Sequence, residues 1–97
     1  MFARLKQLYL EVKNQNDLTY KSIPFFQTKM REIRVELIKI SAQQGEQLSR
    51  DVSDALRLIT ITEREDLSNI ESYPKEVPKY LGRVKTSVMA NLAFVGK

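Results

Sequence analysis

The sequence predicts an all-α fold, a small bundle of four to five mostly antiparallel helices in one domain that spans residues 1–97. Two observations predict it. Apolar residues recur at steps of three and four along most of the chain, which places an apolar stripe on each helix. The segments between these periodic stretches are short, which favours packing of consecutive helices against each other. A chain of this length buries roughly two-thirds of the surface that it exposes when unfolded, enough for one core.

The longest stripe lies between residues 24 and 42. Its apolar members are Phe26, Met30, Ile33, Leu37 and Ile40. Pro24 suits the first turn of this helix, where its missing N–H is no loss. Gly45 is either a C-terminal cap or a flexible point within a longer helix. We expect the other helices to cover this stripe, with Ile33 and Leu37 buried at the centre of the bundle.

Residues 2–14 predict a helix that precedes this one. Its apolar face consists of Phe2, Leu5, Leu8, Tyr9, Leu10 and Val12. Short polar residues at 14–17 end the helix, and a connector then leads to Pro24. The adjacent Phe25 and Phe26 point in different directions on a helix. One of them therefore faces inward, and the other is available to a neighbouring element or a partner chain.

A further periodic run predicts a helix over residues 47–59. Its apolar members are Leu48, Val52, Ala55, Leu56 and Ile59. Residues 59–62 are all β-branched, which weakens helix propensity, and Thr62 with Glu65 forms a capping-box pattern. This favours a helix restart near residue 63, and the alternative is an uninterrupted helix over 47–71. In both cases Pro74 ends it.

The last helix is expected from about residue 78 to 94, after a linker bracketed by prolines. Its stripe is Val77, Leu81, Val84, Val88, Leu92 and Val95, broadened by Met89 and Phe94. We expect Lys79, Arg83 and Lys85 to lie together on its outer side. Gly82 weakens this helix by about 1 kcal/mol relative to Ala, and it would allow another helix to approach closely.

The composition argues against catalysis and metal binding. The chain has no Cys and no His, so it lacks thiolate ligands, disulfides and the side chain best suited to acid–base chemistry near neutral pH. Two carboxylate pairs have helical i,i+3 spacing, namely Asp51 with Asp54 and Glu63 with Asp66. Such pairs are most often solvated acidic faces. We therefore expect no enzymatic activity, no metal and no cofactor.

The first residues do not resemble a signal peptide, because Arg4, Lys6 and Glu11 interrupt the apolar run. No stretch approaches the length of a membrane span. Absence of Cys is typical of an intracellular compartment. We expect a cytoplasmic protein without a membrane partner.

The net charge of +4 is unevenly distributed along the chain. Residues 1–45 hold eight Lys/Arg and four acids, residues 46–71 hold three and seven, and residues 72–97 hold five and one. The favoured interpretation is that the basic ends pair loosely with the acidic middle, and the alternative is a basic surface for nucleic acid or an acidic partner. The candidate contact residues are Lys75, Lys79, Arg83, Lys85 and Phe25. A protein ranks ahead of nucleic acid as the partner, because the aromatic residues fall on apolar stripes and offer no stacking platform beside these charges.

Residues 4–67 resemble the helical A domain of GINS-type replication subunits. That pattern is an opening helix with Leu-Tyr and Glu, a connector to an aromatic pair, a long amphipathic helix and a further helix with spaced Asp and Arg. The matching positions are Leu8, Tyr9, Glu11, Phe25, Phe26, Ile33, Leu37, Asp54, Leu58 and Arg64. The chain departs from the pattern after Ser72 and lacks the small β-rich B domain. The resemblance implies partners such as a replicative helicase or polymerase.

Two hypotheses of function follow. The first is a non-enzymatic accessory or scaffold subunit that acts through protein–protein contacts, in a DNA replication complex if the resemblance holds. The second is a small basic nucleic-acid-binding protein, which a steep salt dependence of binding would reveal. Apolar residues on more than one helix side, including Phe25 and Met89, further predict a dimer or a tight hetero-complex.

Overall fold

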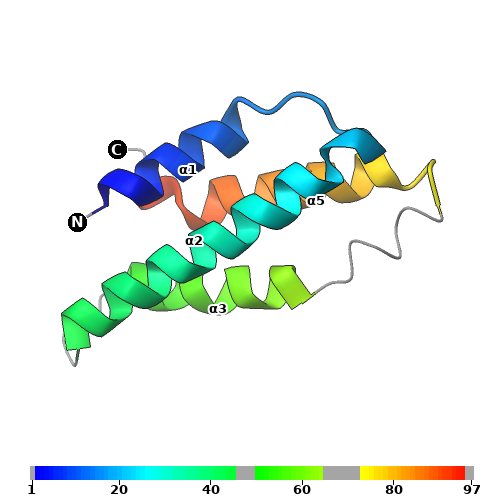
Figure 1. The fold of residues 1–97 in the computed structure, drawn as a ribbon. Helices are drawn as coiled ribbons and strands as arrows, with labels where there is room; N and C mark the ends of the chain where they lie inside the picture. The colour runs from blue at the N-terminus through cyan, green and yellow to red at the C-terminus, as the bar shows by residue number, and fades with distance from the viewer. Residues whose placement is uncertain (1, 46–49, 65–72, 96–97) are drawn as a thin grey trace.

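A computed structural model describes residues 2–45, 50–64 and 73–95, which form a helical bundle (Figure 1). The helices are α1 (Ala3–Lys13), the short 3-10 helix η1 (Tyr20–Ser22), α2 (Ile23–Gln44), α3 (Arg50–Arg64), α5 (Val77–Asn91) and the short 3-10 helix η3 (Ala93–Val95). These three ranges contain no strand. The predicted all-α fold is therefore confirmed.

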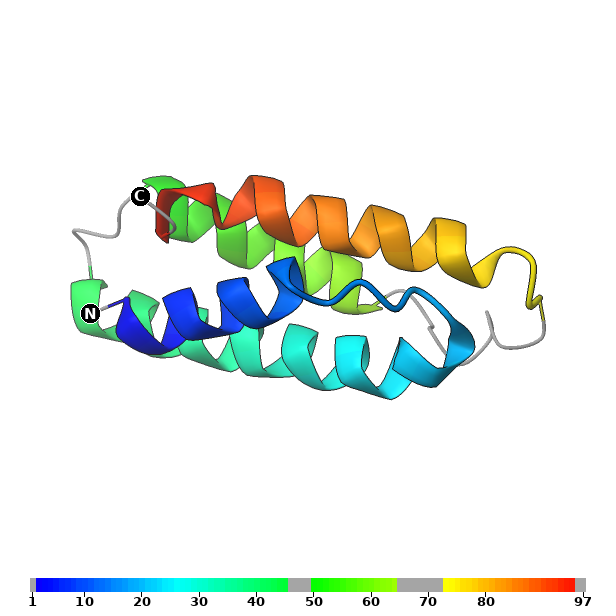
Figure 2. The ribbon, with the colours of Figure 1, turned by 90° about the horizontal axis from the view of Figure 1, so that it is seen from above.

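The four α-helices of the described residues run alternately in opposite directions, as the two views in Figures 1 and 2 show. Helix α1 packs against α2 and α5, and α3 packs against the same two helices from the other side. Helices α2 and α5 also contact each other. Helices α2 and α5 therefore each pack against α1, against α3 and against each other, which is an arrangement typical of a four-helix bundle.

The core lies where the predicted apolar stripes of the helices meet. Ile33 and Leu37 are both 0% exposed, so their predicted burial is confirmed. The stripes also bury Leu5, Leu8, Val12, Phe26, Met30, Ile40, Val52, Ala55, Ile59, Val77, Leu81, Val84, Val88, Leu92 and Val95. Ile23, the first residue of α2, and Tyr9, within α1, also join this cluster. A single continuous core thus holds all four described α-helices together.

Leu10 was expected on the buried face of the first helix, and that prediction is wrong. Its side chain is 39% exposed, whereas Leu8 and Val12 are fully buried. Each residue of an α-helix turns the side chain by about 100°, so Leu10 lies about 200° away from Leu8. The hydrophobic residue type alone misled the prediction, because the helical angle places Leu10 on the solvent side.

Helix α3 continues without a break through the β-branched residues 59–62 and ends at Arg64 among the described residues. The predicted restart near residue 63 is therefore wrong, and the alternative of an uninterrupted helix holds as far as Arg64. Ile59 is 0% exposed. Burial of such side chains in tertiary packing outweighs the few tenths of a kcal/mol by which β-branching disfavours a helix. Leu48, Asp66 and the rest of residues 46–49 and 65–72 lie outside the described residues.

Glycine and proline mark the helix ends as expected. Gly45 caps α2 with a φ of +56°, and its N–H donates to the Ser41 carbonyl. That backbone conformation favours glycine over residues with a Cβ. Pro24 and Pro78 both lie in the first turn of their helices. Helix α5 ends at Asn91, and the last predicted turn tightens into η3.

Candidate interaction surfaces

Lys79 and Arg83 lie one turn apart on the exposed side of α5, and Lys75 lies in the turn that precedes this helix. The Arg83 guanidinium carbon lies 5.9 Å from the centre of the half-buried Tyr80 ring, a cation–π distance. Lys75 and Lys79 make no ion pair with another described residue. Three of the predicted contact residues thus form an exposed cationic edge.

Lys85 does not share that edge, which corrects the prediction that it lies beside Lys79 and Arg83. It follows Arg83 by two residues, about 200° around the helix. Its side chain is half-buried, and Nζ donates to the Gln15 carbonyl at 2.7 Å. Asn16 Oδ1 lies 3.5 Å from the same ammonium. Lys85 therefore fastens the connector between α1 and η1 to α5.

The connector runs along the outside of α5 towards the beginning of that helix. Leu18 Cδ1 lies 3.8 Å from the position that a β-carbon at Gly82 would take, three residues before Lys85. The close neighbour of Gly82 is thus a connector side chain, where the sequence led us to expect a helix. Within the connector, Asp17 accepts hydrogen bonds from Thr19 Oγ1 at 2.7 Å and from Thr19 N at 3.0 Å. These bonds lower the pKa of the Asp17 carboxyl, because they favour its ionised form.

Phe25, the fifth predicted contact residue, is half-buried and packs against the core cluster. Its ring meets Phe26 edge-on at a centroid distance of 5.4 Å, and Lys29 Nζ lies 5.6 Å above it. Met89 is also half-buried against the core. Phe25 thus meets a neighbouring residue of its own helix, and both side chains stay partly exposed, so the dimer or hetero-complex remains a prediction.

The residues that are exposed instead were not predicted from the sequence. Tyr20 and Tyr73 are the most exposed large hydrophobic residues of the described chain, at 61% and 63%. Tyr20 opens η1, and Tyr73 precedes Pro74 in the approach to α5. A signal was available, because neither tyrosine continues a helical apolar stripe.

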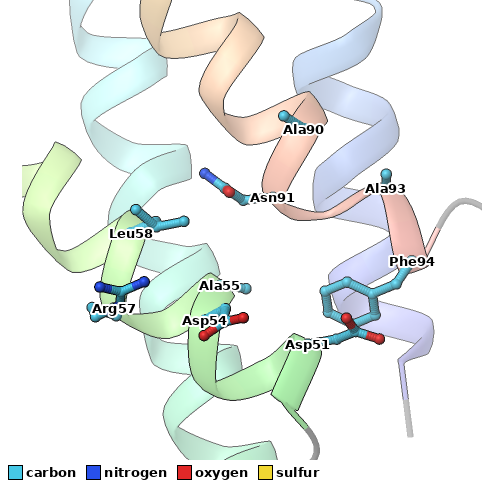
Figure 3. A pocket seen from close by; sticks show the side chains of 9 residues that line it. All are labelled: Asp51, Asp54, Ala55, Arg57, Leu58, Ala90, Asn91, Ala93 and Phe94. Atoms are coloured by element: carbon cyan, nitrogen blue, oxygen red, sulfur yellow. The ribbon is translucent and has the colours of Figure 1, made fainter.

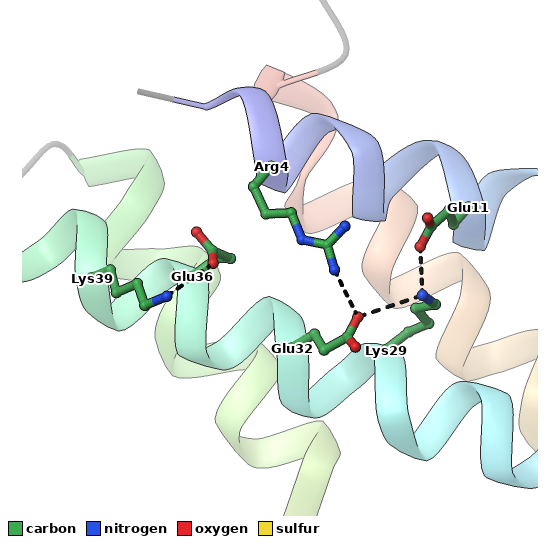
Figure 4. Close-up of polar contacts among 6 residues, drawn as sticks. All are labelled: Arg4, Glu11, Lys29, Glu32, Glu36 and Lys39. Atoms are coloured by element: carbon green, nitrogen blue, oxygen red, sulfur yellow. Dashed lines mark hydrogen bonds and ion pairs between the residues drawn. The ribbon is translucent and has the colours of Figure 1, made fainter.

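Four charged side chains form an ion-pair network between α1 and α2 (Figure 4). Lys29 Nζ lies 2.6 Å from Glu11 Oε2 and 3.4 Å from Glu32 Oε2, and Arg4 Nη2 lies 3.4 Å from the same Glu32 oxygen. The hydrogen bond to Glu11 raises the pKa of Lys29 above its ordinary value. The network joins the two helices, and it lies beside a shallow hollow of α2.

That hollow, of about 230 Å³, is lined by Arg4, Arg31, Glu32, Val35 and Glu36. Val35 is 40% exposed, and Ile38, one turn further along α2, is 46% exposed. Both lie on the side of α2 that faces away from the buried Ile33 and Leu37. We call Val35, Ile38 and this hollow the outer α2 surface. It combines two large aliphatic side chains with a rim of charges.

A second hollow, of about 380 Å³, lies between α3 and the end of α5 with η3 (Figure 3). Its lining combines apolar side chains, including those of Leu58 and Phe94, with the polar side chains of Asp51, Asp54, Arg57 and Asn91. Asp54 Oδ2 lies 3.8 Å from Arg50 Nε, and both aspartates are exposed. The described residues contain no group of three or more side chains placed to hold a metal ion. The predicted solvated acidic face matches this arrangement, while Glu63 and Asp66 have no described side chains.

None of the described helices has the length and apolar content needed to cross a bilayer. No family model, curated protein or solved structure matches the chain.

Proposed function

We propose that the protein is a non-enzymatic helical accessory subunit that acts through protein–protein contacts, and that the outer α2 surface is where its partner docks. The observation that carries the proposal is the joint exposure of Val35 and Ile38 on the longest helix, at 40% and 46%. Contiguous exposed apolar residues with a polar rim are typical of interaction sites. The partner is a protein chain with an apolar side chain for the hollow beside Val35.

The surroundings of this surface support the proposal. Glu36 pairs with Lys39 at 3.4 Å, and Glu32 pairs with Lys29 and Arg4. Paired charges of both signs leave little net field, so burial of the aliphatic groups supplies the affinity, at about 25 cal/mol per Å² of apolar area. The rim then contributes mainly specificity.

We extend the proposal to a DNA replication complex on the resemblance of residues 4–67 to the GINS A domain. Several positions of that pattern, including Leu8, Phe26, Ile33 and Leu37, are fully or almost fully buried. They account for packing of the bundle. The partner contact is therefore assigned to side chains outside the shared pattern.

The test compares the wild-type chain with the double variant Val35→Ser and Ile38→Ser. Leu10→Ser is the matched control, because Leu10 is an aliphatic residue of similar exposure on another helix face. Tagged proteins are expressed in cells in which the chain is native, and co-purifying proteins are quantified. Light scattering measures self-association of the same samples.

We expect wild type to retain a replication subunit or to form a defined oligomer. The double variant should associate at least tenfold more weakly than wild type, since a loss of about 1.4 kcal/mol changes affinity tenfold. The affinity of the control should stay within about twofold of the wild-type value. A monomeric wild type that retains no protein would contradict the proposal. So would equal losses in the double variant and the control.

A further inference from the structure

The beginning of α5 and the η1 turn lie at the same end of the bundle. Lys85 holds Gln15, and Leu18 packs beside Gly82, so the connector travels back along α5 as its residue numbers rise. An extended residue advances about 3.3 Å and a helical one about 1.5 Å. Two residues beyond Leu18, the chain has therefore reached the first turns of α5. Figures 1 and 2 show η1 and the beginning of α5 at this same end.

This placement adds Lys21 to the cations found on α5. We call the exposed residues Tyr20, Lys21, Tyr73, Lys75, Lys79 and Arg83 the basic end. Lys21, like Lys75 and Lys79, makes no ion pair within the described parts of the chain. In the sequence, residues 15–31 contain one acid, Asp17, and residues 73–97 contain one, Glu76. The Asp17 carboxylate accepts two hydrogen bonds from Thr19 and also attracts Lys21, without a direct ion pair.

The aromatic side chains of the basic end differ from those elsewhere in the described bundle. Phe26 is fully buried, Phe25 packs against it, and the Phe2 and Phe94 rings meet edge-on at 5.6 Å. Tyr20 and Tyr73 instead expose about three-fifths of their surface to water. The two exposed rings therefore occur at the same end of the molecule as cations that make no direct ion pair with a described residue.

We propose that the basic end binds single-stranded nucleic acid. The ammonium and guanidinium groups of Lys21, Lys75, Lys79 and Arg83 would neutralise phosphates, and the Tyr20 and Tyr73 rings would stack on bases. Cationic grooves with exposed aromatic rings are how sequence-tolerant single-strand binders work. An acidic protein would use the charges but leave both rings without a role. This reverses the order of partners that the sequence alone favoured, because the missing stacking platform is now present.

This surface is separate from the outer α2 surface, so the inference does not rest on the function proposed above. Its test measures fluorescence anisotropy of labelled 20-nucleotide single strands of DNA and RNA, with a duplex of the same length, near physiological salt. The charge variant is Lys75→Gln, Lys79→Gln and Arg83→Gln. Its matched control is Lys6→Gln, Lys13→Gln and Arg57→Gln, three exposed cations outside both proposed surfaces. The ring variant is Tyr20→Ala with Tyr73→Ala.

We expect wild type to bind at least one single strand with micromolar or tighter affinity, and the duplex at least fivefold more weakly. The charge variant should bind the single strand at least tenfold more weakly. The slope of its log affinity against log salt concentration should flatten by about 2, because each phosphate contact on a single strand contributes about 0.7. The ring variant should bind the single strand at least fivefold more weakly, with an unchanged salt dependence of binding. The control should stay within about threefold of wild type. Circular dichroism should show equal helicity in all variants, since the substituted side chains lie outside the core.

Several results would overturn the inference. One is the absence of single-strand binding at tens of micromolar protein. Another is an equal loss in the charge variant and its control, which would show general attraction to a basic protein. Unchanged affinity in the ring variant would eliminate stacking. A polyglutamate peptide that binds this end more tightly than the oligonucleotides would assign it to an acidic protein instead.

Discussion

The α1–α2 side and the basic end each present several cations, but only one of these regions pairs them within the described chain. Between α1 and α2, Lys29 and Arg4 meet Glu11 and Glu32 at 2.6–3.4 Å. At the basic end, Lys75 and Lys79 make no ion pair with a described residue, and the attraction between Lys21 and Asp17 is not a direct ion pair. Net charge along a sequence therefore does not reveal which cations are available for binding. Pairing across helices decides that.

The two regions also differ in burial. The Lys29 side chain is 17% exposed and that of Glu11 is 33% exposed, so their attraction is screened less than that of a fully exposed pair. Lys75 and Lys79 are exposed. The first set of charges therefore contributes to stability, whereas the second leaves stability almost unchanged and is available for binding. Four predictions test this contrast.

The largest effect is expected from the core that supports both regions. Leu37→Ala should lower the free energy of unfolding by about 2–5 kcal/mol, because Leu37 is 0% exposed and its truncation leaves a cavity. Urea denaturation followed by circular dichroism measures the loss. A loss below about 1 kcal/mol would mean that α2 does not face the core as described.

A smaller effect is expected in the ion-pair network. Lys29→Gln should cost about 1 kcal/mol, and a double-mutant cycle with Glu11→Gln should assign most of it to that pair. High salt should reduce the coupling only in part, because the pair is half-buried. A coupling energy near zero would show that the ion pair between α1 and α2 does not contribute to stability.

The pKa of Lys29 gives the same prediction a pH dependence. Because the folded pKa is raised above 10.5, the stabilisation is fully present below the unfolded value. It is lost as pH rises through the folded pKa, since both states then release the proton. The difference in stability between wild type and Lys29→Gln should therefore shrink above about pH 10.5. A difference that grows in this range would show that the sign of the shift is wrong.

Gly82→Ala should raise stability by about 0.5–1 kcal/mol, because Gly82 lies inside α5 and an added methyl group would make ordinary contact with Leu18 at 3.8 Å. Gly45→Ala is the informative counterpart. There the φ of +56° is strained for any residue with a Cβ, so that variant should be less stable. Thermal unfolding of both variants provides the measurement. A destabilised Gly82→Ala would mean that the connector packs more tightly against α5.

The smallest effect is expected at the basic end. Lys75→Gln together with Lys79→Gln should change the free energy of unfolding by less than about 0.5 kcal/mol, because neither side chain has an ion-pair partner among the described residues. Chemical denaturation of this variant beside Lys29→Gln compares the two regions directly. A loss of stability as large as that of Lys29→Gln would show that the cations of the two regions do not differ in their contribution to stability.

Much of the fold was predictable, because burial of a helix face imposes a period on the sequence. The stripes through Leu37 and Val88 follow that period without exception among their described members. The predicted burial of Leu10 was wrong because its residue type was considered without its angular position on the helix. The predicted helix restart near residue 63 was wrong because local helix propensity was given more weight than the packing of Ile59 in the core.

The candidate contact residues were only partly predictable. Lys79 and Arg83 lie one helical turn apart, so their shared edge follows from spacing alone. The turn of Lys85 onto Gln15 depends on a contact between residues 70 positions apart, which no local pattern encodes. The approach of Tyr20 and Lys21 to α5 depends on the same connector path. Tertiary structure was therefore needed to recognise the basic end.

The central claim is that the cations of the basic end bind nucleic acid and those between α1 and α2 do not. An amide chemical-shift titration of the ¹⁵N-labelled chain with a single-stranded oligonucleotide tests it directly. We expect the perturbed amides to cluster at Tyr20, Lys21 and the non-proline residues of 73–83, while the signals of Arg4, Glu11 and Lys29 do not shift. Perturbations that instead centre on the α1–α2 side, or that spread evenly over every exposed lysine and arginine, would contradict it.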